Sequence, residues 1–128
     1  NNIADYSLYM EEAGMISQLR SPAKGIRVLG KVDKVYLENT NLIYSIADEN
    51  QNIGNIRETF FLNQLKLKNQ VTSSKTSDFK IEDMDFEVGG KGKTLKQIQN
   101  AERGFLVKDD IETGFLNTIP LWHFGLMY

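Results

Sequence analysis

The sequence contains no cysteine. Without thiols the chain forms no disulfide bond and offers no thiolate ligand for zinc, a composition typical of proteins kept inside the cell. It also lacks an apolar run near the roughly 20 residues that cross a bilayer, and no signal peptide precedes the first periodic segment. We therefore expect a cytoplasmic protein that makes no membrane contact.

Histidine is almost absent as well. The single histidine, His123, stands between Trp122 and Phe124 and has no second histidine or cysteine with which to share a metal. This setting predicts a packed ring, because a zinc site or a catalytic triad needs further partners, and no serine lies in a nucleophile-elbow context. The chemistry that remains is that of carboxylates and lysines.

Length and composition predict a folded domain. The chain has 128 residues, of which 41% are hydrophobic and 25% charged, enough for one domain with a core or a small domain with an appendage. Its net charge of −2 argues against a protein that coats nucleic acid by bulk electrostatics. Because the chain begins with Asn1 instead of methionine, we expect that a longer polypeptide contains it.

Positive charge gathers in two segments. The first contains Arg20, Lys24, Arg27, Lys31 and Lys34 against Asp33 alone, and the second contains Lys91, Lys93 and Lys96. Such local clusters on an acidic chain are compatible with phosphate contact, and they are equally compatible with solvated loop lysines.

Periodicity and turn signals predict the elements. We expect a helix over 3–13 ended by Gly14, strands over 15–19 and 26–29, and a strand over 34–37. Asn39 to Asn41 offer cap oxygens for a short helix through Ile46, and a longer helix follows over 55–67. We also expect strands at 78–81 and 84–88, a helix at 95–101 and a strand at 104–107. The terminal segment is expected to be held in the core by Leu121, Trp122 and Phe124.

The stretch from Ser77 to Thr94 organises the candidate site. Asp78 and Glu87 fall on two strands predicted to pair, and strand alternation places Glu87 and Gly89 on one face. Lys91 joins that face only if the strand continues through Gly90. An acid on each strand with lysines just beyond is able to hold a divalent metal against a phosphate, and it also fits an ordinary hairpin with charged edges.

The end of this stretch imitates a nucleotide-binding loop. Residues 87–94, E-V-G-G-K-G-K-T, end in the Gly-Lys-Thr of a P-loop between a strand and a helix. Glu87 replaces the required first glycine and points a carboxylate at the phosphates that the loop must hold. Too little chain follows Thr94 for the remaining parallel strands, so we expect no nucleotide-binding residues.

Four segments together resemble a known family. They are K-V-Y-L-E-N-T-N-L from Lys34, N-I-R-E-T-F-F-L-N-Q-L from Asn55, F-E-V-G-G-K-G-K-T from Phe86 and I-P-L-W-H-F-G-L-M-Y from Ile119. In this order, across about residues 6–128, they are similar to the uncharacterised C-terminal domain of prokaryotic AAA+ type ATPases. The resemblance implies an upstream ATPase domain as a partner in the same polypeptide.

The resemblance also implies an α+β fold in two parts. Residues 1–33 correspond to a partial winged helix, a helix plus a β-hairpin wing, although this part taken alone also fits a helix and hairpin that merely pack on the main domain. Residues 34–128 correspond to a restriction-endonuclease-like core of the PD-(D/E)xK superfamily, in the order helix, strand, strand, helix, strand.

In that superfamily two carboxylates hold Mg²⁺ and a lysine polarises the attacking water. By position Asp78 and Glu87 match the strand acids and Glu58 the helix acid, although Glu58 also has capping-box spacing from Asn55. Gly89 stands where the lysine belongs, and Lys91 reaches that place only through a bulge at Gly89 and Gly90.

Two functions follow as hypotheses. The first is a non-catalytic accessory domain without a cofactor that binds DNA or a partner protein through Arg20, Lys24, Arg27, Lys31, Lys91 and Lys93. The second is a Mg²⁺-dependent DNA phosphodiesterase with Asp78 and Glu87 as ligands and Lys91 as the polarising group. Gly89 favours the first, and a domain that only stabilises a larger enzyme is a third alternative.

Overall fold

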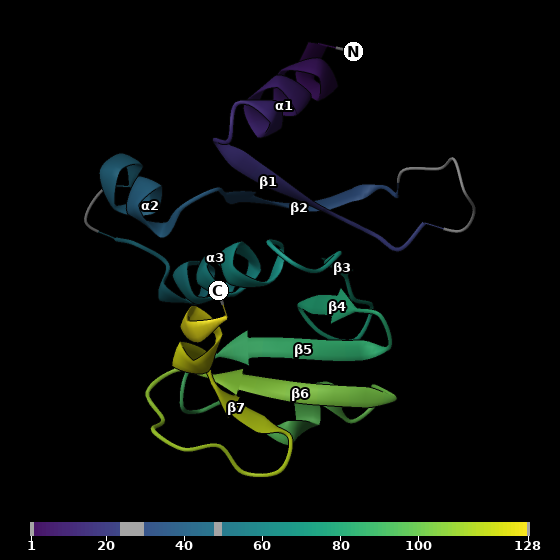
Figure 1. The fold of residues 1–128 in the computed structure, drawn as a ribbon, viewed down its shortest axis with the longest axis vertical. Helices are drawn as coiled ribbons and strands as arrows, with labels where there is room; N and C mark the ends of the chain where they lie inside the picture. Colours follow the sequence, from purple (N-terminus) through teal and green to yellow (C-terminus); the bar gives the residue numbers. More distant parts are fainter. Residues whose placement is uncertain (1, 24–29, 48–49, 128) are drawn as a thin grey trace.

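The computed structural model describes residues 2–23, 30–47 and 50–127, and Figure 1 shows its elements. Within this part of the chain, helices combine with two β-sheets, which confirms the prediction of an α+β fold. The helices are α1 (Asn2–Glu12), α2 (Thr40–Ile46) and α3 (Ile53–Leu65), with two 3₁₀ helices, η1 (Leu95–Ile98) and η2 (Leu121–Leu126). No helix in the described ranges is both long enough and apolar enough to span a bilayer.

The smaller sheet pairs β1 (Ile16–Arg20) with β2 (Val32–Leu37) in antiparallel register. The larger sheet has the order β3 (Thr72–Ser73), β4 (Phe79–Ile81), β5 (Met84–Gly89), β6 (Arg103–Lys108) and β7 (Thr118–Pro120). Its first three strands are antiparallel neighbours, whereas β6 runs parallel to both β5 and β7. Helix α3 lies between the two sheets (Figure 1).

Local signals in the sequence explain several boundaries. Gly14 has φ +69°, a conformation that costs glycine little, and it follows the end of α1. The Asn39 side chain accepts a hydrogen bond from the backbone N–H of Asn41 and caps α2. In the same way Asn52 accepts from Asn55 N and begins α3. The capping box predicted for Asn55 and Glu58 is therefore wrong, since the helix already begins two residues before Asn55.

The core forms where α3 presses aromatic side chains against both sheets. Phe61 is fully buried, and its ring centroid lies 5.2 Å from that of Phe79 and 4.9 Å from that of Phe124 in η2. The ring centroid of Phe86 in β5 lies 5.4 Å from that of Phe61, so Phe61 contacts three aromatic rings. The same cluster contains Leu19 and Tyr36 of the small sheet, so one core joins the two sheets. Alternation along β5 puts Asp85, Glu87 and Gly89 on the opposite face of the large sheet.

Three predictions need correction. The segment at 95–101 is a 3₁₀ helix of four residues, too short to be the predicted helix. Leu121 and Phe124 are buried as expected, but Trp122 is 53% exposed. His123 is exposed too, with its ring held only edge-on against Trp122, because the 3₁₀ geometry of η2 turns residues 122 and 123 outward.

The predicted wing is only partly visible. Its first strand is β1, and the strand expected at 26–29 lies outside the described residues. The described partner of β1 is β2, in which Val32 pairs with Arg20 and Leu37 with Ile16. The expected division between residues 33 and 34 falls inside β2, and the independence of the two parts stays a prediction.

Removal of the central ring tests this account of the core. Phe61→Ala leaves a cavity between α3 and both sheets, and we expect it to lower the free energy of unfolding by about 3–5 kcal/mol. Leu67→Ala, at a position that is 67% exposed, is the matched control and should change it by less than about 0.5 kcal/mol. Urea denaturation followed by circular dichroism measures both, and equal effects would contradict the assignment of Phe61 to the core.

Candidate carboxylate and lysine site

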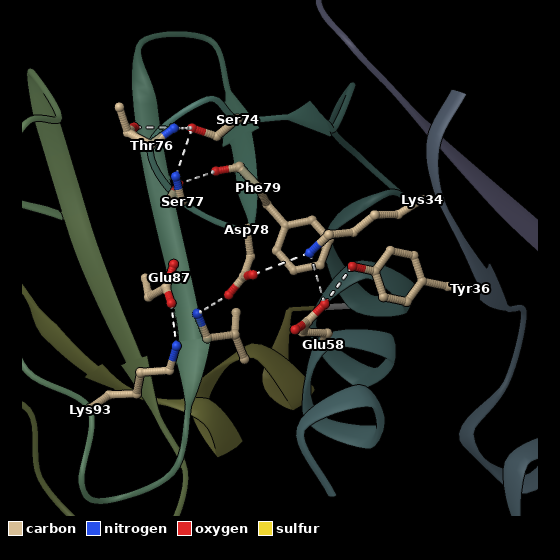
Figure 2. Close-up of polar contacts among 11 residues, drawn as sticks. Lys34, Tyr36, Glu58, Ser74, Thr76, Ser77, Asp78, Phe79, Glu87 and Lys93 are labelled. Atoms are coloured by element: carbon tan, nitrogen blue, oxygen red, sulfur yellow. Dashed lines mark hydrogen bonds and ion pairs between the residues drawn. The ribbon is translucent and has the colours of Figure 1, made fainter. Parts of the chain in front are cut away.

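The two strand acids lie at the same end of the β4–β5 pair. The ladder ends with Phe79 opposite Phe86, and Asp78, one residue before β4, donates its N–H to the carbonyl oxygen of Phe86 at 3.1 Å. Asp78 is therefore not a ladder partner of Glu87, and its carboxylate bonds the backbone of β5 at the next residue, Val88. Figure 2 shows the two carboxylates on either side of the β5 backbone, with lysines reaching them from other segments.

Asp78 closes the end of a short strand. Because β4 begins only at Phe79, the N–H of Val88 has no strand partner, and Oδ2 of Asp78 accepts its hydrogen at 3.0 Å. The other oxygen, Oδ1, accepts from Nζ of Lys34 at 3.3 Å. Both oxygens of this carboxylate are thus engaged by the protein, and its side chain is only 15% exposed.

Strand β2 reaches the site from the small sheet. Besides Asp78, Lys34 Nζ contacts Oε2 of Glu58 on α3 at 3.4 Å, and Tyr36 donates its hydroxyl to that oxygen at 2.5 Å. Burial first, and then the bond to Glu58, raise the pKa of the Tyr36 phenol well above its usual range. For Lys34, desolvation opposes ionisation, but the nearby carboxylates of Glu58 and Asp78 raise its pKa overall.

Glu87 is the most buried carboxylate of the three. Its residue is 8% exposed, and its Oε1 accepts a hydrogen bond from Nζ of Lys93. Burial raises the pKa of Glu87, the bond from Lys93 lowers it, and the negative charges of Asp78 and Glu58 raise it again. The net direction is upward, as expected where like charges gather in a partly dry site.

The lysine beside Glu87 comes from residue 93. Strand β5 ends at Gly89, the chain turns back through a bond from Lys93 N to the oxygen of Gly90, and the Lys93 side chain lies over Gly89. A Cβ added at residue 89 would stand 2.6 Å from Cε of Lys93. The glycine therefore leaves room for a lysine that arrives from four residues farther along. Lys91 is exposed and makes no hydrogen bond or ion pair with the described residues.

Arg57 holds this loop in place. Its Nε donates to Asp109 at 2.9 Å, and the N–H of Asp109 donates to the oxygen of Gly89 at 2.8 Å. The guanidinium also packs on Gly90, where an added Cβ would stand 2.9 Å from Nη1. Helix α3 thus fixes the start of the loop that carries Lys91 and Lys93.

The basic residues predicted for nucleic acid divide between distant places. Lys24 and Arg27 lie outside the described residues, and Arg20 Nη1 donates to the oxygen of Gly30 at 3.3 Å. The end of β1, which bears Arg20, and the start of β2, just after Lys31, lie at the opposite side of the molecule from the end of β5 (Figure 1). Among the described residues, Arg20 and Lys31 therefore do not share a surface with Lys91 and Lys93.

The arrangement does not fit a magnesium ion. Among residues 2–23, 30–47 and 50–127, no three His, Cys, Asp or Glu side chains gather closely enough to share a metal. Lys34 occupies the space between Glu58 and Asp78, and Lys93 holds Glu87. Protein ammonium groups thus take the positions from which a cation would neutralise these acids.

Sequence reasoning identified Asp78, Glu87 and Glu58 but missed the partners that define their state. Alternation along β2 places Lys34 and Tyr36 on one face, but this pattern does not indicate that the face lies against Asp78. Lys93 carried no local signal, since its position depends on how the loop returns over Gly89.

The chain matches no family model, no curated protein and no solved structure. The site therefore has to be interpreted from its own geometry.

The raised pKa of Glu87 predicts a pH dependence. The folded chain keeps this proton to higher pH than the unfolded chain, so wild-type stability declines as the pH rises from about 4.5, the ordinary value, through the folded pKa. Glu87→Gln removes that loss. We expect the stability of Glu87→Gln relative to wild type to increase across this interval and to level off above it.

Urea denaturation of both proteins at a series of pH values measures the difference. Two curves that stay parallel through the interval would contradict a raised pKa. Lys93→Ala is the companion variant, because loss of the ammonium should raise the pKa of Glu87 further, as a shift of its side-chain carboxyl resonance in NMR titration.

Proposed function

We propose that this chain is a nuclease-like accessory domain of an AAA+ type ATPase, and that it contacts the phosphodiester backbone of DNA without cutting it. The observation that carries the proposal is the neutralisation of the three candidate acids by the protein's own lysines. The order α3, β3, β4, β5, η1, β6 contains the expected helix, two strands, short helix and strand, with β3 inserted, and supports a restriction-endonuclease-like core, while the resemblance of four segments supports the ATPase context.

Internal neutralisation removes the need for a metal. Lys34 pairs with Glu58 and Asp78, Lys93 pairs with Glu87, and Tyr36 adds a hydrogen bond to Glu58. Buried carboxylates are stable only when paired or hydrogen-bonded, and each of these three has such a partner. A site satisfied in this way keeps the geometry of the fold without an open position for an ion.

The contact with DNA is assigned to the loop after β5. Lys91 and Lys96 are exposed and form no ion pair with an acid of the described residues, while Arg57 and Gly90 hold the loop in a fixed path. Lysines presented in this way bind phosphate through charge, and each phosphate neutralised contributes to affinity and to its salt dependence. Arg20 and Lys31, on the other side of the molecule, supply a separate contact through the wing.

A second candidate function rests on Lys93. Its ammonium lies beside Glu87 in the space above Gly89, where a lysine of the superfamily pattern would project. This position removes the sequence argument against a phosphodiesterase, which was the lack of a lysine near Glu87. Metal-dependent DNA cleavage is therefore the alternative, with Lys93 in the role first considered for Lys91, and it requires an ion to replace Lys93 at Glu87.

Variants of the loop test the contact with DNA. We expect Lys91→Ala combined with Lys96→Ala to weaken binding to a short duplex and to reduce the slope of log affinity against log salt by about 1 for each phosphate that the loop no longer neutralises. Lys68→Ala, an exposed lysine after α3, is the control and should leave both unchanged. Fluorescence anisotropy measures the affinity and its salt dependence. Wild-type binding in the double variant would assign the loop to a protein partner instead.

A plasmid nicking assay separates the two functions. The wild-type chain is expected to leave supercoiled DNA intact in Mg²⁺ or Mn²⁺, because the acids are held by lysines and, within the described ranges, do not gather around an ion. Cleavage that depends on the metal and disappears in Glu87→Gln would establish the phosphodiesterase and reject the accessory function. Cleavage that persists in Glu87→Gln would indicate a contaminating nuclease.

A further inference from the structure

The loop that follows β5 carries three lysines, and they differ in how the protein uses their charge. Lys91 and Lys96 are exposed, and neither forms an ion pair with an acid of the described residues. Lys93 stands between them in the sequence, and its ammonium donates to Oε1 of Glu87. Figure 2 shows the Lys93 side chain reaching from the loop to the Glu87 carboxylate beside β5. Of these three lysines, Lys93 is therefore the one whose charge the protein engages.

The path of the loop is fixed on both sides of Lys93. At one end α3 packs on Gly90, where an added Cβ would stand 2.9 Å from an arginine nitrogen. At the other end Thr94 N donates to the Gln97 side chain at 3.2 Å, where η1 begins. Between them, a Cβ added at Gly92 would meet no atom beyond its chain neighbours within 4 Å, so the middle of the loop borders open space. Release of Lys93 is therefore a rotation of its flexible side chain and leaves the backbone in place.

The pair of Lys93 and Glu87 is separable from the rest of the site. Lys34 contacts two carboxylates at once, Glu58 at 3.4 Å and Asp78 at 3.3 Å, and so joins β2 to α3 and to the large sheet. Lys93, in contrast, has Glu87 as its single ionic partner among the described residues. Opening this pair therefore breaks no bond that holds the two sheets and α3 together.

Glu87 competes with phosphate for the same ammonium. A carboxylate and a phosphate both accept charged hydrogen bonds from lysine, so one lysine that serves one of them is withheld from the other. Because Glu87 is 8% exposed, the ammonium that it binds is drawn toward the sheet. The Lys93 side chain is still 33% exposed, which leaves it a way out to solvent. A phosphate on the loop gains this third positive charge only when Lys93 leaves Glu87.

We propose that Glu87 is an autoinhibitory anion, which withholds Lys93 from DNA until a phosphate of the backbone takes its place. The inference rests on the proposed function, contact of this loop with DNA, and describes how that contact is regulated. Lys91 and Lys96 bind first, and Lys93 joins them by turning away from Glu87. Opening the ion pair consumes part of the gain from the third contact, so the wild-type chain binds more weakly than the three lysines of the loop allow.

Glu87→Gln tests the proposal, because the amide keeps the shape of the side chain and removes the charge that holds Lys93. Fluorescence anisotropy of a short duplex over a series of salt concentrations measures the effect. We expect tighter binding by up to about fivefold at low salt, the strength of one exposed ion pair. The slope of log affinity against log salt should steepen by up to about 0.9, the value for one further phosphate. A cooperative urea transition shows that the variant is folded.

Glu12→Gln is the matched control. It makes the same change of net charge at an exposed acid of α1, on the far side of the small sheet from the loop (Figure 1), and it should bind as wild type does. Equal gains in Glu12→Gln and Glu87→Gln would overturn the proposal, because net charge alone would then explain them.

Addition of Lys93→Ala to Glu87→Gln separates release of the lysine from plain repulsion between the carboxylate and DNA. If Lys93 is the group released, the second substitution removes the whole gain and returns the slope to the wild-type value. A gain that survives Lys93→Ala overturns the proposal, since Glu87 would then act on DNA directly.

The same measurements distinguish failure of this inference from failure of the proposed function. Unchanged affinity and slope in Glu87→Gln, with binding still weakened by Lys91→Ala and Lys96→Ala, would overturn the inference alone. Absence of DNA binding by both wild type and Glu87→Gln would overturn it together with the proposed function. Binding by Glu87→Gln but not by wild type would support both, with the inhibition then complete.

Discussion

The arrangement of the site depends on one hydrogen bond at the end of a three-residue strand. Strand β4 is too short to pair with all of β5, and the Val88 N–H left over is satisfied by the Asp78 carboxylate. That bond draws Asp78 into the plane of the sheet and leaves one oxygen for Lys34. Since Lys34 also contacts Glu58, a single unpaired backbone group connects the large sheet, α3 and the small sheet.

This connection changes how the small sheet is understood. The predicted division put the two strands of the small sheet in different parts, 1–33 and 34–128; in the structure Leu19 of β1 and Tyr36 of β2 both belong to the common core, and Lys34 lies among the acids. A ligand that moves the small sheet would also move the cation between Glu58 and Asp78. Strand β2 therefore couples the small sheet to the site in two ways, through the packing of Tyr36 and through the charge of Lys34.

Much of the fold was predictable from local signals. Alternation identified β4, β5 and β6, and glycine and asparagine marked the end of α1 and the start of α2. The pairing of β4 with β5 also followed from the short turn between them. The identity of the partner lysine did not, since Lys93 reaches Glu87 through a loop whose path depends on Arg57 and on bonds to Asp109. Trp122 and His123 were misplaced for a related reason, because apolar composition does not reveal which side of a 3₁₀ turn faces water.

The contact between η2 and α3 has a consequence for synthesis of the protein. Phe124 packs at 4.9 Å from Phe61, and β7 just before it completes the parallel part of the large sheet. Until residues 118–126 have left the ribosome, α3 presents an uncovered aromatic face and β6 an unpaired edge. Long-range contacts of this kind form late, so the nascent chain emerges with this aromatic face and this strand edge exposed, surfaces of the kind that promote aggregation.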